Sequence, residues 1–135
     1  MSEVIKTVSR ALRLLRVIDP NESPEAEQVT GAIDALNDMM QRWEANGLAL
    51  GWSAVEAPTD VLPVPLEAEE AVAFNLAIVL RPEYGVAIDP DVYQRAEDGL
   101  NALRRDVLVA NPLQMRSRLQ RTCRYNMITD EYESI

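Results

Sequence analysis

The chain has 135 residues, of which 22 are acidic, 13 are basic and none is histidine, giving a formal charge of −9 at pH 7. This length suits one domain, and the acidic balance disfavours a protein that holds duplex DNA with its whole surface. A single cysteine excludes an internal disulfide and a cysteine zinc site, and the lack of histidine removes the commonest catalytic base and metal ligand.

The N-terminal segment is predicted to be a helix of the folded domain. Residues 1–6 lack the features of a secretory signal, and no apolar run approaches the ~20 residues of a membrane span, so we expect a soluble protein made in the cytoplasm. Ser2 is placed to cap this helix, which should end near Asp19 and Pro20. Its apolar face comprises Val4, Ile5, Val8, Ala11, Leu12 and Leu15, and its basic side chains lie elsewhere: Lys6, Arg10, Arg13 and Arg16.

A second helix is predicted from the start signal Ser23-Pro24 to Asn46, where Gly47 can take the left-handed conformation that closes helices. Its apolar residues recur three and four positions apart, which puts them on one stripe: Ala26, Val29, Ile33, Leu36, Met40 and Trp43. This stripe needs a partner helix and is too short for a coiled coil. We therefore interpret these residues as the core of a compact antiparallel bundle.

The segment after Gly47 is predicted to contain no helix. Leu48, Leu50 and Trp52 alternate with small residues, which is typical of a short extended piece or one arm of a hairpin. Three prolines exclude a helix from 53–65, and this loop is unusually apolar. Two interpretations stay open: packing over the domain's own core, or an interface with another protein formed by Trp52, Val55, Val61, Leu62 and Val64.

A third helix should begin near Pro65 and Leu66, because three glutamates follow in its first turn, and should end before Pro82. Residues 71–80 are apolar nearly all round, so this helix is expected at the centre of the domain or between subunits. If buried, Asn75 must find hydrogen-bond partners.

A fourth helix is predicted from Asp89-Pro90 to Asn111-Pro112, with a stripe at Tyr93, Ala96, Leu100, Leu103 and Val107.

The C-terminal segment differs in charge. Residues 1–111 hold nine basic and nineteen acidic side chains, a formal charge of −10, whereas 112–124 hold four arginines and no acid. The spacing of Met115, Leu119 and Cys123 is compatible with a helical turn. The arginines fit a solvated end, a nucleic-acid contact or an arm docking on an acidic protein, and docking is favoured. The candidate docking residues are Arg116, Arg118, Leu119, Arg121, Arg124 and Tyr125.

No sequence feature points to catalysis. The glycines are scattered singly, so no phosphate-binding loop is present, and Cys123 is expected to be an apolar packing residue. The carboxylate pairs Asp34/Asp38 and Glu67/Glu70 have helical spacing but are explained by solvated helix faces. We therefore expect no enzyme activity, no cofactor and no metal. The fold expected is all-α: a small bundle of about four helices with a short extended or hairpin loop, divided into a helical domain (1–111) and a C-terminal docking arm (112–135).

Three segments in order, Val8–Val17, Ala35–Leu48 and Asn75–Gly85, together resemble the tail accessory factor, or head-to-tail adaptor, of short-tailed phages, also described as a packaged-DNA stabilisation protein. The segment with Trp43 and Gly47 is the most specific. The resemblance covers roughly residues 4–110. It departs from the family where Arg16 replaces a glycine expected after the leucine pair of the first helix, and beyond Pro112, where we find no alignment.

The resemblance implies a structural virion protein at the neck, the head-tail junction. Its partners would be the portal protein, a tail protein (nozzle or tail tube) and itself, as a ring that is a dodecamer in this family. DNA would be only channel cargo, and the apolar loop would be a subunit or tail interface. The alternative is a small helical nucleic-acid-binding or regulatory module that uses the arginine segment. A cell-wall hydrolase would need an acid and a base in one groove, for which the sequence offers no pair.

Overall fold

The computed structural model describes residues 2–110 and 123–134, with side chains placed in 2–107 and 127–130. These residues form four helices and one two-stranded hairpin: α1 (Val4–Leu14), α2 (Ala26–Ala45), α3 (Leu66–Tyr84), α4 (Pro90–Ala110), β1 (Cys123–Asn126) and β2 (Glu131–Ser134). The predicted small helical bundle is confirmed. Residues 48–52 contain neither helix nor strand, so the hairpin arm considered there is absent. The strands lie in the C-terminal segment, and Cys123, whose spacing was compatible with a helical turn, begins β1.

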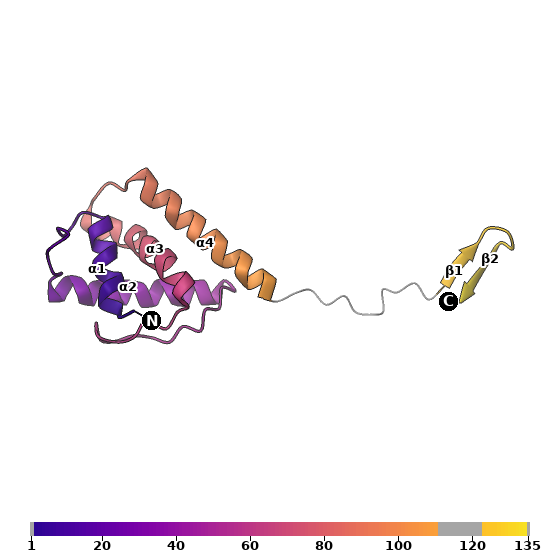
Figure 1. The fold of residues 1–135 in the computed structure, drawn as a ribbon, viewed down its shortest axis with the longest axis horizontal. Helices are drawn as coiled ribbons and strands as arrows, with labels where there is room; N and C mark the ends of the chain where they lie inside the picture. Colours follow the sequence, from indigo (N-terminus) through magenta and orange to yellow (C-terminus); the bar gives the residue numbers. More distant parts are fainter. Residues whose placement is uncertain (1, 111–122, 135) are drawn as a thin grey trace.

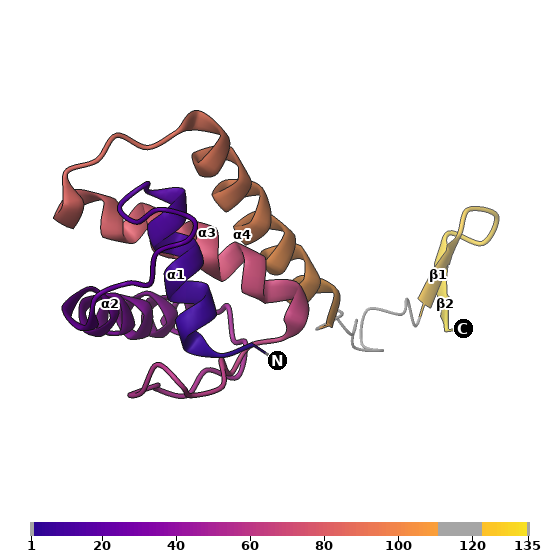
Figure 2. The same cartoon turned by 60° about the vertical axis from the view of Figure 1, so that its left-hand side comes forward.

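Helix α3 is the centre of the bundle. It packs against each of the other helices, with α1 and α2 on one side and α4 on the other (Figure 1), and a second view shows the same order (Figure 2). Its buried residues surround the helix axis: Ala68, Ala71, Val72, Ala73, Phe74, Leu76, Ala77 and Leu80. The partly buried Asn75 donates to the carbonyls of Ala71 (2.8 Å) and Ala96 (3.1 Å), which meets the predicted need for partners.

Helix α1 begins and ends differently from the prediction. Ser2 is not its cap, because the N-cap is Glu3, which makes no side-chain capping bond. The helix also ends at Leu14, short of Asp19. There Arg16, at the position where the resemblance led us to expect glycine, adopts a left-handed conformation (φ 57°), and the Val17 amide donates to the Leu12 carbonyl at 3.1 Å. This backbone arrangement is a Schellman motif, which stops the helix.

Helix α2 ends through the same motif, as predicted. Gly47 has φ 92°, its amide donates to Glu44, and the Leu48 amide donates to the Trp43 carbonyl at 3.0 Å. Its start lies later than the Ser23-Pro24 signal, because a capping box joins Glu25 and Gln28.

The boundaries of the last two helices agree with the prediction in three of four places. Helix α3 begins at Leu66, and α4 begins at Pro90, where the Asp89 carbonyl accepts the amides of Val92 and Tyr93. The prediction that α3 ends before Pro82 is wrong. The proline removes one backbone bond from the last turn, and the buried residues before it hold that turn in place until the left-handed Gly85 (φ 62°) closes it.

The predicted apolar stripes form most of the core. In α2, Ala26 is exposed and Trp43 is only half-buried, whereas the other four stripe residues are buried: Val29, Ile33, Leu36 and Met40. In α4 the stripe is shifted at its start, because Tyr93 is 47% exposed and Val92 is buried in its place. Helices α3 and α4 approach closely at Gly99, where a Cβ would lie 2.9 Å from the Ala71 Cβ.

Candidate interaction surfaces

The apolar loop 53–65 mostly packs into the domain's own core. Of the five residues predicted to form an interface, Val55, Leu62 and Val64 are buried and belong to the core cluster. Trp52 is half-buried, and Val61 is 53% exposed. Within the described part of the chain, the Trp52 indole nitrogen is buried without a hydrogen-bond partner. Of the two interpretations left open by the sequence, the structure thus favours core packing for three of the five residues and does not support side-chain contact of these three with a partner.

Long-range hydrogen bonds fasten this loop in place. The Asn37 side-chain amide donates to the Val55 carbonyl (2.8 Å) and its oxygen accepts the Val55 amide (3.1 Å). At the other end of the loop, the carbonyls of Asp60 and Pro58 each accept an amide from the first turn of α1, at 2.9 Å. The loop therefore supplies the cap that Ser2 was expected to provide.

Asp60 shapes the turn that presents these carbonyls. Its Oδ2 atom accepts the backbone amides of Ala57 (2.9 Å) and Glu56 (3.1 Å). These two bonds, led by that of Ala57, favour the charged carboxylate and lower the pKa of Asp60 from its ordinary value. We therefore expect protonation of Asp60 to weaken the two hydrogen bonds that hold this turn.

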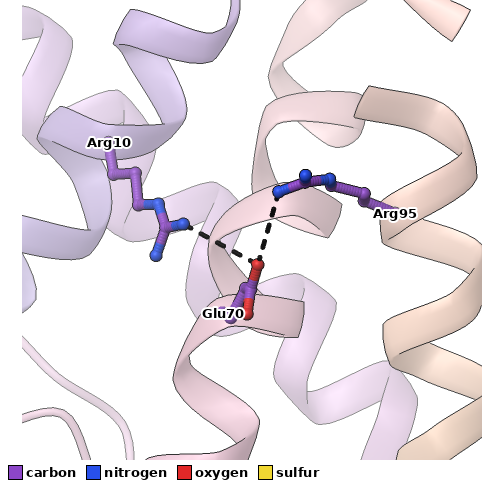
Figure 3. A network of polar contacts seen from close by, with 3 residues as sticks. All are labelled: Arg10, Glu70 and Arg95. Carbon is purple, nitrogen blue, oxygen red and sulfur yellow. Dashed lines mark ion pairs between the residues drawn. The ribbon is translucent and has the colours of Figure 1, made fainter. Parts of the chain in front are cut away.

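The largest ion-pair cluster among the described residues joins three helices. Figure 3 shows Arg10 from α1 and Arg95 from α4 reaching the carboxylate of Glu70 on α3 from opposite sides. Their nitrogens lie 3.8 and 3.9 Å from the same oxygen. Both guanidinium groups also lie over the Phe74 ring, at 5.4 and 5.9 Å from its centroid. Glu70 thus links α1, α3 and α4 through ion pairs, a role that was not predicted from the sequence.

A second carboxylate pair lies in a cleft. Asp34 and Asp38 of α2 are exposed and line a cleft of about 470 Å³ between α2 and α3, together with Glu83 and Arg42. The sequence alone did not place these carboxylates in a cleft. Among the described residues, no group of three or more acidic or cysteine side chains is arranged to hold a metal ion.

A more apolar cleft, here named the Trp43 cleft, opens between the end of α2 and the last turns of α4. It measures about 340 Å³ and is lined by Trp43, Asn46, Gly47, Leu48, Leu100, Arg104 and Val107. The Schellman motif builds one wall, because it turns Leu48 back beside Trp43. Arg104 is the charged residue of the lining, and its guanidinium donates to the side-chain oxygen of Asn101 at 3.4 Å.

The C-terminal hairpin carries two of the predicted docking residues. Arg124 and Tyr125 lie in β1, opposite Glu133 and Tyr132 in the strand register. The remaining four predicted docking residues lie outside the described residues: Arg116, Arg118, Leu119 and Arg121. Between the strands, Met127 is 84% exposed and Ile128 is 95% exposed. The sequence signal for this exposed pair was two apolar residues directly before Thr129 and Asp130, and it was missed.

A model of the P22 tail accessory factor family matches residues 7–131. The chain belongs to this family. Comparison with curated proteins finds no match. As a tail accessory factor, the chain is a structural, tail-related component of a phage virion. No helix in the described residues is long and apolar enough to cross a membrane.

The extent of the tail accessory factor match corrects the sequence comparison. We expected the resemblance to stop near residue 110, but the family match continues through β1 and reaches the first residue of β2. The exposed turn at 127–130 is therefore part of the matched region. The Trp43 cleft is part of it as well, and its walls come from the segment with Trp43 and Gly47 and from the stripe of α4.

Proposed function

We propose that this tail accessory factor is a head-to-tail adaptor at the virion neck. It would form a ring under the portal, extend the DNA channel, help to retain the packaged genome and dock a tail protein such as a nozzle or tail-tube protein. The observation that carries the proposal is the family match over residues 7–131. Synthesis in the host cytoplasm, before assembly on the capsid, is part of the same proposal.

The distribution of charge supports this role. The helical domain, residues 1–111, has nine basic and nineteen acidic side chains. Such a surface repels phosphates, which suits a channel wall along which DNA slides without being held. The arginines of 112–124 have the opposite sign and can form bidentate bonds with carboxylates of a portal protein. We assign portal binding to Arg116, Arg118, Leu119, Arg121, Arg124 and Tyr125.

The ring requires a contact between two different patches of each subunit, which closes when the rotation fits. Within the apolar loop, Val61 and Trp52 keep enough exposed surface to join a subunit or tail interface, whereas the buried loop residues act through the core. The family suggests a dodecamer. Each contact can be weak in free solution and still hold once the portal keeps the subunits in register, because binding raises their effective concentration.

Native mass spectrometry of the protein with and without its portal tests the proposal. We expect a monomer alone and a ring of copies on the portal. Deletion of 112–135 should leave the helical circular dichroism per residue nearly intact and abolish attachment to the portal. One or two copies per saturated portal would contradict the ring, and loss of the helical signal on truncation would contradict the arm.

DNA retention separates this role from that of a nucleic-acid-binding module. A protein that neutralises several phosphates loses affinity steeply as salt rises, because counterions are released on binding. We expect the adaptor to retain almost no DNA at any salt concentration. Strong retention at low salt that disappears at high salt, and that depends on the arginines of 112–124, would favour the nucleic-acid-binding module.

A further inference from the structure

The Trp43 cleft is suited by its size and its lining to bind apolar side chains. Its volume of about 340 Å³ is far more than one water molecule needs, and its walls include Trp43, Leu48, Leu100 and Val107. Arg104 adds one cationic side chain to this lining, in a domain that is otherwise strongly acidic. The ion pairs among the described residues do not include Arg104. The cleft therefore fits an apolar segment that carries a carboxylate beside it.

The turn of the C-terminal hairpin has the complementary composition. Turns favour glycine, asparagine, aspartate and serine, and Asp130 fits that preference with a left-handed backbone (φ 56°). Met127 and Ile128 do not fit it, yet both are almost fully exposed. A two-stranded hairpin is marginally stable in water unless another surface packs against it. Two exposed apolar side chains at its tip, next to an aspartate, supply such a contact.

We propose that the turn Met127–Asp130 of one copy inserts into the Trp43 cleft of a neighbouring copy. Met127 and Ile128 fill the cleft, and Asp130 faces Arg104 at its edge. The two surfaces are different patches of the same chain, which is what a head-to-tail ring contact requires. This inference rests on the proposed adaptor ring and specifies one contact within it. A contact made by two side chains is small, so it depends on the portal to hold neighbours in register.

Cross-linking between two variants tests the contact. In a Cys123→Ser background, which removes the natural cysteine, one variant carries Val107→Cys in the cleft and the other carries Ile128→Cys in the turn. The two are purified separately, one with a mass tag, then mixed on the portal and treated with a short bis-maleimide. We expect a covalent dimer that contains one copy of each variant. The matched control is Tyr93→Cys, which lies on the same helix, 47% exposed and outside the cleft, and should give only background.

If the Trp43 cleft is occupied by the turn of the same chain, or if the turn binds the portal, the cross-linked products differ from the mixed dimer. A double variant with both cysteines that cross-links only within one chain would place the turn in its own cleft and overturn the proposal. A cross-link between the turn and the portal would overturn it as well. A ring seen by native mass spectrometry without the mixed dimer would overturn this contact and leave the adaptor intact. Absence of any ring on the portal would overturn both the turn-to-cleft contact and the proposed adaptor function.

Tryptophan fluorescence gives a second measurement. The chain has two tryptophans, so a Trp52→Phe variant reports Trp43 alone. We expect its emission to shift to the blue on assembly, because the inserted turn removes water from the indole. Ile128→Ser should abolish this shift and weaken the ring contact about tenfold or more, given the apolar area lost. Leu66→Ser removes another exposed apolar side chain, at a site outside the cleft, and should leave both the blue shift and the ring contact unchanged. An unchanged shift in Ile128→Ser would contradict the insertion.

Discussion

The side chain of Asn37 binds both backbone groups of Val55, with its amide nitrogen 2.8 Å from the carbonyl oxygen and its amide oxygen 3.1 Å from the backbone nitrogen. An amide side chain can do this because it carries a donor nitrogen and an acceptor oxygen on the same planar group. These two hydrogen bonds resemble the paired backbone bonds between neighbouring strands of a sheet, but here they join a helix to a loop. It holds Val55 in the core, so the loop becomes part of the domain.

Replacing Asn37 should therefore loosen the loop. Asn37→Ala leaves two partly buried backbone groups without their partners, and we expect a loss of about 1–3 kcal/mol in the free energy of unfolding. Urea denaturation measures it. Asn101→Ala is a suitable control, because Asn101 is exposed and makes one long bond, of 3.4 Å, to Arg104. Equal effects of the two substitutions would show that the Asn37 bonds do not stabilise the fold.

The turn at Asp60 should make stability depend on acid. Because its pKa is lowered in the folded state, the carboxylate contributes stability above its unfolded pKa of about 3.9, and that contribution is lost as the pH falls through the folded value. We expect Asp60→Ala to have a lower denaturation midpoint than the natural chain at neutral pH. The gap should narrow as the pH falls through the lowered folded-state pKa, below which both the folded and the unfolded states are protonated. A gap that stayed constant with pH would argue against a role for the charge.

Two helical glycines form a matched pair with opposite expected effects. At Gly99 an alanine would place its Cβ 2.9 Å from the Ala71 Cβ and force α3 and α4 apart, costing about 1–3 kcal/mol. At Gly31 nothing lies within 4 Å of the added Cβ. Gly31→Ala should therefore stabilise the protein by about 0.4–1 kcal/mol, because alanine is the better helix former. Thermal unfolding of both variants checks the two signs.

Trp43 should contribute less to stability than the sequence pattern indicates. A fully buried tryptophan costs about 3–5 kcal/mol when cut to alanine, but Trp43 is only half-buried beside its cleft. We expect Trp43→Ala to cost less than about 3 kcal/mol, and Met40→Ala, which empties a fully buried site of the same helix, to cost about 2–5 kcal/mol. A larger loss for Trp43 than for Met40 in urea denaturation would assign Trp43 to the core.

Arg16 should be replaceable by glycine without loss of stability. Its left-handed backbone is unfavourable by about 1–2 kcal/mol for a residue with a Cβ. Its ion pair with Asp89, at 3.2 Å, is exposed and contributes at most about 1 kcal/mol. We expect Arg16→Gly to be neutral or to stabilise the protein by up to about 1 kcal/mol in chemical denaturation. A clear loss would mean that the ion pair holds the start of α4.

The features that sequence predicts well here are local ones. The three-four spacing and the proline and glycine signals predicted α2, α3 and α4, because periodicity and backbone chemistry act within a few residues. The end of α1 was missed because Arg16 occupies a position where glycine normally gives the signal. The burial of Val55 depends on Asn37, a partner 18 residues away, and no local pattern reports such a pair.

The candidate surfaces were harder to predict for the same reason. The Trp43 cleft combines the end of one helix with the last turns of another, and only the packing of both against α3 brings them together. The hairpin was missed because its turn lacks the glycine and asparagine residues that mark hairpins in sequence. The informative signal was instead the apolar pair Met127 and Ile128, which lies where turns usually carry polar residues or glycine.

The capping of α1 by a distant loop also bears on the order in which the chain folds. The amides of Val4 and Ile5 find their acceptors only in Asp60 and Pro58, and the Ser2 amide binds Glu69 across 67 residues. Closing loops of this length slows folding, since chain entropy is lost before any contact compensates for it. The first turn of α1 is therefore expected to form after α2 and α3 have met. During synthesis, the N-terminal segment would wait for most of the domain to emerge before becoming structured.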